Sequence, residues 1–201
     1  MTLRPDLALV AGLIPAGSRV LDLGCGSGEL LAALIASTGC RGTGVEIDPD
    51  SVLAAITAGV PVIELDLDSE LHDFADHSYD VVVLSRTVQT LHRPVEVLNH
   101  MGRIGERLIV SVPNFGYWRH RLRLLRGRMP MSREIPHAWY DTPNLRHTTL
   151  VELEELFDRL GLTVERRIVL SPAGTPLPSG NRFANVVAGS AVYALRSNHT
   201  D

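Results

Sequence analysis

The chain has 201 residues, of which 45% are hydrophobic and 21% charged, and its formal net charge is −4. These are the values of a globular protein that is long enough to bury a core, and they exclude a disordered segment. The slightly acidic balance gives no global reason to expect nucleic acid or an anionic membrane as a partner.

Short β-branched runs alternate with longer amphipathic runs, which is the pattern of a parallel sheet flanked by helices. They predict strands near residues 18–23, 41–46, 61–65, 79–84 and 106–112, with helices near 28–37, 49–58 and 94–102. Asp48 followed by Pro49 is typical of a helix start, because the carboxylate caps the helix and proline needs no amide hydrogen in the first turn.

The last third of the chain predicts one more helix and a hairpin. Thr148 is expected to cap a helix that ends near Gly161, with acidic residues in its early turns. The runs "LTVERRIVL" (162–170) and "NVVAGSAVYAL" (185–195) then predict two antiparallel strands, joined by a loop over residues 171–180 that is rich in proline and glycine.

Residues 113–147 form an unusual segment between the fifth strand and that helix. It holds both tryptophans and five of the ten aromatic residues, and no acidic residue occurs over residues 107–133. Its "RHRLRLLRGR" run puts Arg119, Arg123 and Arg126 on one helix face and leucines on another. A long aromatic segment after a strand's carboxyl end predicts a lid or a docking surface, although a basic helix with a packed loop is the simpler alternative.

The run "VLDLGCGSG" (20–28) predicts a nucleotide-binding turn between a strand and a helix. Three glycines alternate after an acidic residue, and the expected binding residues here are Asp22, Gly24, Cys25, Gly26 and Gly28. A dinucleotide fingerprint counted from Gly24 would need glycine at position 29, where the chain has Glu29. The carboxylates of Asp22 and Glu29 disfavour a pyrophosphate and favour a cationic ligand, and this points to S-adenosylmethionine.

Further candidate binding residues follow the next three strands. Glu46 can accept both ribose hydroxyls, which by itself suits NAD as well as S-adenosylmethionine, and Ile47 follows it. Asp66 is expected to meet the adenine amino group, with the alternative of an ordinary turn residue, and Leu67 to pack on the ring. Ser85 ends the fourth strand, where open sheets bind ligands, and Arg86 and Gln89 are further pocket candidates.

The cysteines and the hydropathy pattern indicate the cellular compartment in which the chain is expected. The two cysteines, Cys25 and Cys40, have neither CxxC nor Cys/His metal spacing, so neither a disulfide scaffold nor a metal site is expected. No signal-peptide pattern and no apolar run of membrane-spanning length is present. We expect a single domain over residues 1–201, located in the cytoplasm and without membrane contact.

These motifs together resemble a class I methyltransferase domain, and more narrowly the MetW family of methionine-biosynthesis proteins. The narrower resemblance lies in "SVPNFGYWRHRLRLLRGRMP" and "WYDTPNLRHTTLVELEEL" and covers roughly residues 17–170. It implies an α/β Rossmann-like fold with a mostly parallel seven-stranded sheet and an antiparallel edge strand. It also implies a ligand, S-adenosylmethionine or S-adenosylhomocysteine, and a partner, a homoserine O-acyltransferase.

Three functions compete at this point. The first is an accessory or regulatory protein of that acyltransferase, the second an active small-molecule methyltransferase, and the third a protein that binds or methylates nucleic acid. The net charge of −4 makes the third the weakest, since nucleic-acid binding rests on positive charge. No residue stands out as catalytic, and no methyl acceptor follows from the residues or the resemblance.

Overall fold

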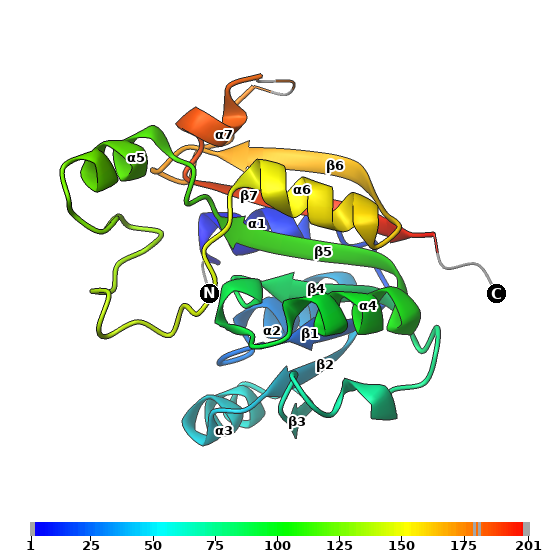
Figure 1. Cartoon of the computed structure of the whole chain (residues 1–201). Helices are drawn as coiled ribbons and strands as arrows, with labels where there is room; N and C mark the ends of the chain where they lie inside the picture. The colour runs from blue at the N-terminus through cyan, green and yellow to red at the C-terminus, as the bar shows by residue number, and fades with distance from the viewer. Residues whose placement is uncertain (1–2, 179, 181, 199–201) are drawn as a thin grey trace.

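The computed structural model describes residues 3–178, 180 and 182–198, and its central feature is a seven-stranded sheet in the order β3-β2-β1-β4-β5-β7-β6 (Figure 1). Strands β1 to β5 are parallel, whereas β7 is antiparallel to both of its neighbours, β5 and the edge strand β6. This confirms the predicted fold class and the hairpin. The strands are β1 (Arg19–Leu23), β2 (Arg41–Glu46), β3 (Val62–Glu64), β4 (Tyr79–Ser85), β5 (Gly105–Pro113), β6 (Leu162–Leu170) and β7 (Ser190–Ser197).

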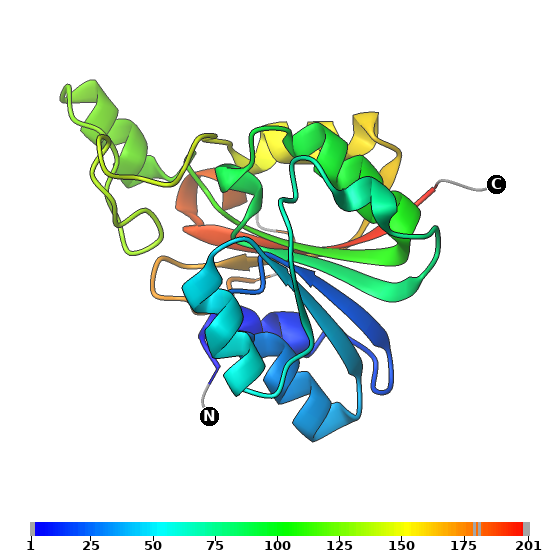
Figure 2. The same ribbon diagram turned by 90° about the horizontal axis from the view of Figure 1, so that it is seen from below.

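Helices cover both faces of the sheet (Figure 2). On one face lie α1 (Pro5–Ala11), α2 (Glu29–Thr38) and α3 (Pro49–Thr57), and on the other α4 (Pro94–Ile104) and α6 (Leu150–Arg159). The short helix α5 (Trp118–Leu125) stands away from the sheet, beyond the carboxyl ends of the parallel strands (Figure 1). The remaining turns are α7 (Ala184–Val187) and single 3₁₀ turns at Leu71–Asp73 and Val88–Thr90.

The two layers bury two apolar clusters, one on each face. Central strands of a parallel sheet are covered on both sides, and this explains why Val20, Leu21 and Leu23 of β1 are all fully buried. Burying each such side chain contributes about 1.5–3 kcal/mol, so the sheet forms a rigid base whose carboxyl edge can carry a site.

Three parts of the structure differ from the sequence-based prediction. α1 was not predicted, because its seven residues are too few to show a periodic pattern. The cap of α6 is Thr149 and not Thr148, since the Thr149 hydroxyl accepts from the Glu152 amide at 3.3 Å. Residues 185–187 form part of α7 and not of a strand, because Asn114 donates to the Asn185 carbonyl and fixes the turn. The expected domain also includes residues 1–2, 179, 181 and 199–201, which lie outside the described residues.

Among the helices described, none is both long enough and apolar enough to cross a membrane. Within the same residues, no group of three or more His, Cys, Asp or Glu side chains is arranged to hold a metal ion.

Candidate functional site

Two adjoining cavities of about 580 Å³ and 370 Å³ lie at the carboxyl ends of β1, β2 and β4. They share the lining residues Gly24, Arg86 and Thr87, so they form one continuous site at the position where open α/β sheets bind ligands. Nine of the ten residues predicted from the sequence line them: Asp22, Gly24, Cys25, Gly26, Glu46, Ile47, Asp66, Leu67 and Ser85. The tenth, Gly28, does not line either cavity.

The glycine loop takes a conformation that only glycine adopts easily. Gly24, Gly26 and Gly28 have φ angles of 72°, 54° and 75°. A Cβ atom on Gly24 would lie 2.6 Å from the Thr87 hydroxyl oxygen, whereas one on Gly26 would meet nothing within 4 Å. Gly28 begins α2, and a Cβ there would press on Val60 at 3.0 Å. Gly24 therefore brings the loop against the residues that follow β4, and Gly28 allows the start of α2 to pack against Ala55 of α3 and Val60.

Asp22 supplies a buried carboxyl group on the wall of the smaller cavity. It lies on β1 between Gly44 of β2 and Val83 of β4, and its exposed fraction is 3%. Burial, and in second place the nearby charge of Glu46, raises the pKa of Asp22 from 3.8 to about 7. A buried carboxyl group that ionises near neutral pH is suited to meet a cationic ligand.

Glu46 fastens the glycine loop to the end of β2. Its Oε2 accepts from the Gly26 amide at 2.8 Å, and its Oε1 accepts from the amides of Ile47 at 2.8 Å and Asp48 at 3.1 Å. A carboxylate oxygen has two acceptor positions, so Oε2 keeps one position for a ligand while Oε1 is filled. Glu46 is thus a structural residue of the site as well as a candidate ligand contact.

Cys25 occupies the space left by Gly44 of β2. A Cβ atom on Gly44 would lie 2.5 Å from the Cys25 sulfur, so the glycine allows the loop to approach the strand. Burial raises the pKa of the Cys25 thiol to about 12. The thiol is neutral at physiological pH, which makes it a packing group and not a nucleophile.

The loop after β3 forms the far wall of the larger cavity. Asp66 both lines the cavity and stabilises its own turn, since its Oδ1 accepts from the Asp68 amide at 2.9 Å. Asp68 in turn accepts from the amides of His92 at 3.0 Å and Arg93 at 2.7 Å. The turn alternative for Asp66 is therefore realised, and Asp68 joins this loop to the one that follows β4.

Ser85 and Arg86 form the wall at the end of β4. The Ser85 and Ser111 hydroxyls lie 2.9 Å apart, and the Arg86 amide donates to the Ser111 carbonyl at 3.0 Å. Arg86 has a φ of 56°, an uncommon value for a residue with a side chain, and its side chain borders both cavities. Gln89 lies behind the wall and does not line either cavity: it is buried, and its amide nitrogen donates to the Arg86 carbonyl.

Several lining residues were not singled out from the sequence. From α1 and the residue before it come Leu7 and Arg4, and from residues 113–147 come Thr142, Pro143 and Leu145. Arg4 and Leu7 belong to no motif, and nothing in the sequence placed them at the site. Thr142, Pro143 and Leu145 lie in the run "WYDTPNLRHTTLVELEEL", which carries the family resemblance, and they follow a strand's carboxyl end, but neither signal assigned them individually.

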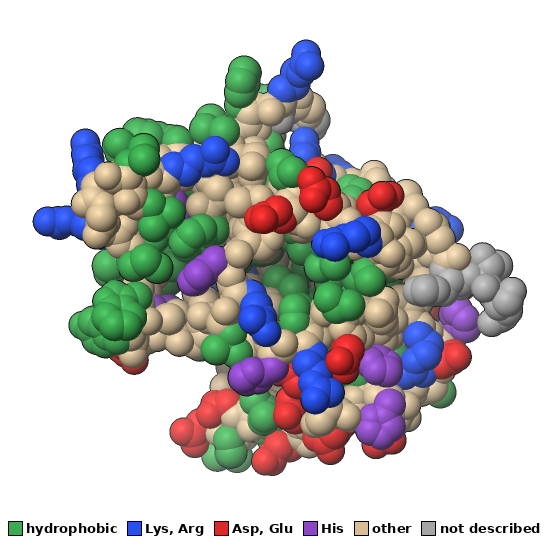
Figure 3. Space-filling model, viewed as in Figure 1, with side chains coloured by type: hydrophobic (Ala, Val, Ile, Leu, Met, Phe, Trp, Pro, Cys, Tyr) green, Lys and Arg blue, Asp and Glu red, His purple; other side chains and the backbone are tan. Residues whose placement is uncertain are grey.

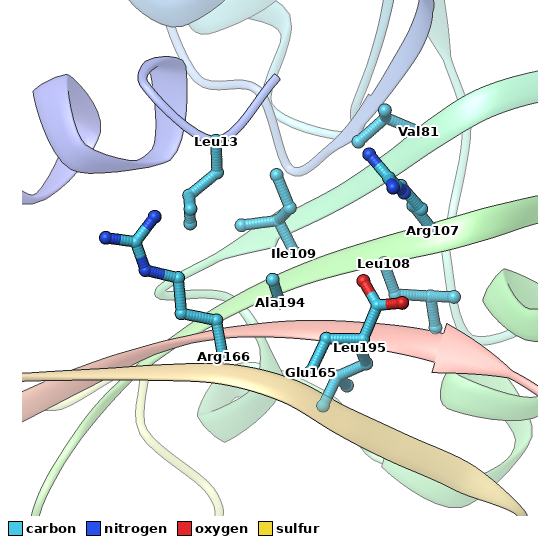
Figure 4. A pocket seen from close by; sticks show the side chains of 9 residues that line it. All are labelled: Leu13, Val81, Arg107, Leu108, Ile109, Glu165, Arg166, Ala194 and Leu195. Carbon is cyan, nitrogen blue, oxygen red and sulfur yellow. The ribbon is translucent and has the colours of Figure 1, made fainter. Parts of the chain in front are cut away.

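A separate hollow of about 140 Å³ lies on the α1 side of the sheet (Figure 4). Ile109 of β5 and Ala194 of β7 line it from the sheet, and Leu13 reaches toward them from the segment after α1 (Figure 4). Arg107 and Arg166 lie on opposite sides (Figure 4). None of the predicted site residues lines this hollow, so it is distinct from the candidate site.

The fold, with its glycine loop and acidic strand ends, is that of the class I S-adenosylmethionine-dependent methyltransferases. Similar solved structures include such a methyltransferase of Archaeoglobus fulgidus (TM-score 0.71, 17% identity, 96% of this chain and 91% of that chain). Another is a methyltransferase of Mesorhizobium loti (TM-score 0.70, 16% identity, 96% and 98%). The [4+2]-cyclase SpnF has a comparable likeness (TM-score 0.68, 16% identity, 96% and 80%), so the fold alone does not define the reaction.

The chain belongs to the family described as methionine biosynthesis protein MetW, whose family model matches residues 4–195. A relative from Rhodopirellula baltica, the bifunctional methionine biosynthesis protein MetXA/MetW, is 37% identical over 178 residues. The match takes in 84% of this chain but only 29% of the length of that relative. The family and the assignment to methionine biosynthesis agree with the resemblance found in the sequence.

Proposed function

We propose that the chain binds S-adenosylmethionine or S-adenosylhomocysteine in the paired cavities and acts as an accessory or regulatory partner of a homoserine O-acyltransferase. The main observation in favour of this ligand is the buried Asp22 carboxyl group beside the glycine loop. S-adenosylmethionine carries a sulfonium and an ammonium group and no phosphate. A carboxylate at this place attracts such a ligand and repels a pyrophosphate.

The other lining residues receive complementary roles under this proposal. Glu46 meets a ribose hydroxyl through the free acceptor position of Oε2, and Asp66 meets the adenine amino group. Leu67 and Ile47 supply apolar contact to the adenine ring, and Ser85 contributes a hydroxyl near the glycine loop. Each role uses a residue that already lines the cavities, so binding needs no rearrangement of the sheet.

The partner is supported by family membership and by the name of the Rhodopirellula relative. That name pairs MetXA with MetW in one protein, and this chain corresponds to 29% of its length. A protein joined to MetW in one chain in a relative is a natural candidate for a partner of this chain. Because no residue indicates a methyl acceptor, we favour the accessory role over catalysis of methyl transfer.

Isothermal titration calorimetry with S-adenosylmethionine, S-adenosylhomocysteine and NAD tests the ligand. Binding of the first two without NAD supports the proposal, and an NAD isotherm with no response to S-adenosylmethionine overturns it. The partner is tested by adding the chain to a purified homoserine O-acyltransferase from the same organism. Acylation should rise, and the increase should respond to S-adenosylmethionine.

An active small-molecule methyltransferase is the alternative, favoured by the methyltransferases among the solved structures that share this fold. It predicts that an extract containing labelled S-adenosylmethionine yields S-adenosylhomocysteine in a reaction that depends on Asp22. An acyltransferase that is fully active alone and indifferent to the chain would favour this alternative.

A further inference from the structure

The surface formed by residues 118–140, called the arm below, is unusually apolar for an exposed segment. Leu125, Trp139 and Tyr140 are exposed by 85%, 71% and 76%. Trp118, Leu124, Met129 and Met131 are further large hydrophobic side chains of the arm that are exposed. Hydrophobic side chains accordingly gather on the side of the molecule from which α5 projects (left in Figure 3). Exposed apolar patches of this kind mark interaction surfaces.

The helix in the arm has little to stabilise it within the chain. Only His120 of the eight residues of α5 is buried. Isolated helices of this length are marginal in water, and most helices gain their stability from packing one apolar face. Trp118, Leu122 and Leu125 lie at positions i, i+4 and i+7 and so form one apolar stripe along α5. Within the described residues this stripe is not buried, so it is a helix face on which a partner could pack.

The arm is anchored at its first end and again at Glu134 and Ile135, and its exposed hydrophobic side chains lie between these two points and at Trp139 and Tyr140. At the first end, Tyr117 and His120 are buried against each other, with ring centroids 5.3 Å apart. At the second point, Ile135 is buried and Glu134 pairs with Arg86. Residues 142–145 then return to the wall of the larger cavity. The segment 113–147 therefore divides into a projecting arm and a part that borders the candidate site.

Positive charge surrounds the apolar side chains of the arm. Residues 118–133 contain six arginines and no acidic residue. Arg119 lies 5.2 Å from the centre of the Trp118 ring, and no salt bridge among the described residues involves Arg119, Arg126 or Arg128. A complementary surface must carry carboxylates around apolar sockets.

We infer that the arm is a protein-docking surface whose occupant is the acyltransferase of the proposed function, through a face that has acidic residues around apolar sockets. This inference rests on the proposed function and adds to it the surface of contact. Tryptophan, tyrosine and arginine are the residues that dominate binding energy at protein interfaces, and the arm presents all three at its exposed part.

Substitutions on the arm, with matched controls, test the inference against the purified acyltransferase. Leu125→Ser and Trp139→Ser remove exposed apolar anchors, and Arg126→Ser removes a positive charge. Each should weaken binding about tenfold or more in calorimetry. The control Leu53→Ser alters a side chain of α3 that is 65% exposed and lies outside the arm, and Arg159→Ser is the matched charge control. Both controls should bind as the wild type does.

The outcomes separate the inference from the proposed function. If the wild type and the arm variants bind the acyltransferase equally well, the arm is not the docking surface, whereas the acyltransferase is still the partner. If the wild type does not bind the acyltransferase, the proposed function fails. A wild-type dimer in sedimentation that Leu125→Ser dissociates would make a second copy the occupant and overturn the inference. Binding of a DNA duplex that Arg126→Ser abolishes would overturn it as well. Because the substituted side chains of the arm are exposed, each variant should keep the fold, and circular dichroism checks this.

Discussion

Arg86 joins two carboxylates that come from distant parts of the chain, Asp6 and Glu134. Its Nη2 lies 2.5 Å from Glu134 Oε2, and its Nε lies 2.8 Å from Asp6 Oδ2. The two acidic side chains are only 6% and 5% exposed, so a single guanidinium is shared by two carboxylates that have little contact with water. Because Arg86 also borders both cavities, it links the candidate site to α1 and to the base of the arm.

Arg86→Ala should therefore destabilise the fold strongly. It would take the nearest positive charge away from the buried Asp6 and Glu134 carboxylates and leave Asp6 only its longer pair with Arg4 at 3.7 Å. Removing one partner of a buried ion pair costs about 3–5 kcal/mol. Thermal or urea unfolding measures the loss. Arg19→Ala is the control, because it removes an exposed pair with Asp80 and should change stability little. Equal losses of stability in the two variants would show that the ion pairs of Arg86 stabilise the fold no more than an exposed pair does.

Glu134→Gln should be far milder than Arg86→Ala. Burial raises the pKa of Glu134, which means that its charged form is disfavoured in the folded state. A neutral amide of the same shape removes that cost while keeping a hydrogen-bond acceptor for Arg86. Unfolding of the single and double variants measures the coupling between the two residues. A coupling near zero would contradict the contact.

Two of the glycines differ in what a side chain would meet, and they form a matched pair. Gly24→Ala adds a clash with Thr87 to the strain of positive φ, whereas Gly26→Ala adds the strain alone. The strain amounts to about 1–2 kcal/mol in each case. We expect Gly24→Ala to abolish S-adenosylmethionine binding in calorimetry and Gly26→Ala to weaken it only moderately. The reverse order would contradict the described geometry of the loop.

Glu46→Ala should lower both ligand affinity and stability, because the side chain holds three backbone amides as well as facing the cavity. Loss of a charge-assisted hydrogen bond to the ligand costs about 1.5–3 kcal/mol. Asp48→Ala, two residues away, is the control. Asp48 caps α3 through the Ser51 amide and lines neither cavity, so this variant should lose some stability and keep its affinity. Calorimetry and thermal melts separate the two effects.

The sheet and the main site residues could be predicted because local sequence determines them. β-branched runs give the strands, and the acidic residues at their carboxyl ends, Asp22 and Glu46, necessarily reach one edge of a parallel sheet. The Arg86–Glu134 pair could not be predicted, since 48 residues separate its members and no periodicity connects them. α7 was missed for a related reason: Val186 and Val187 favour a strand, but contacts made by Asn185 with Asn114 and Leu150 fix a helical turn.

Asp22 gives the most direct test of how the site works, because its carboxyl group lowers stability in the absence of a ligand. Its pKa is about 7 in the folded chain, against an ordinary value of 3.8 that the unfolded chain retains. Between these values the folded chain binds more protons than the unfolded one, so the free energy of unfolding falls as the pH rises from about 4 to about 7. Asp22→Asn should remove this decline, with a higher melting temperature than wild type at pH 8 and little difference at pH 4.

Ligand binding should reverse the loss of stability that the ionised Asp22 carboxylate causes. The ammonium group of S-adenosylmethionine stabilises the ionised carboxylate, so binding at pH 6 should release a proton from Asp22 in the wild type and none from Asp22→Asn. Calorimetry in two buffers of different ionisation enthalpy counts the protons. Affinity of the wild type should also rise between pH 5 and pH 7. Equal proton release by the two proteins would show that the ligand cation does not face Asp22, and S-adenosylmethionine would then have to bind elsewhere in the chain or in another orientation.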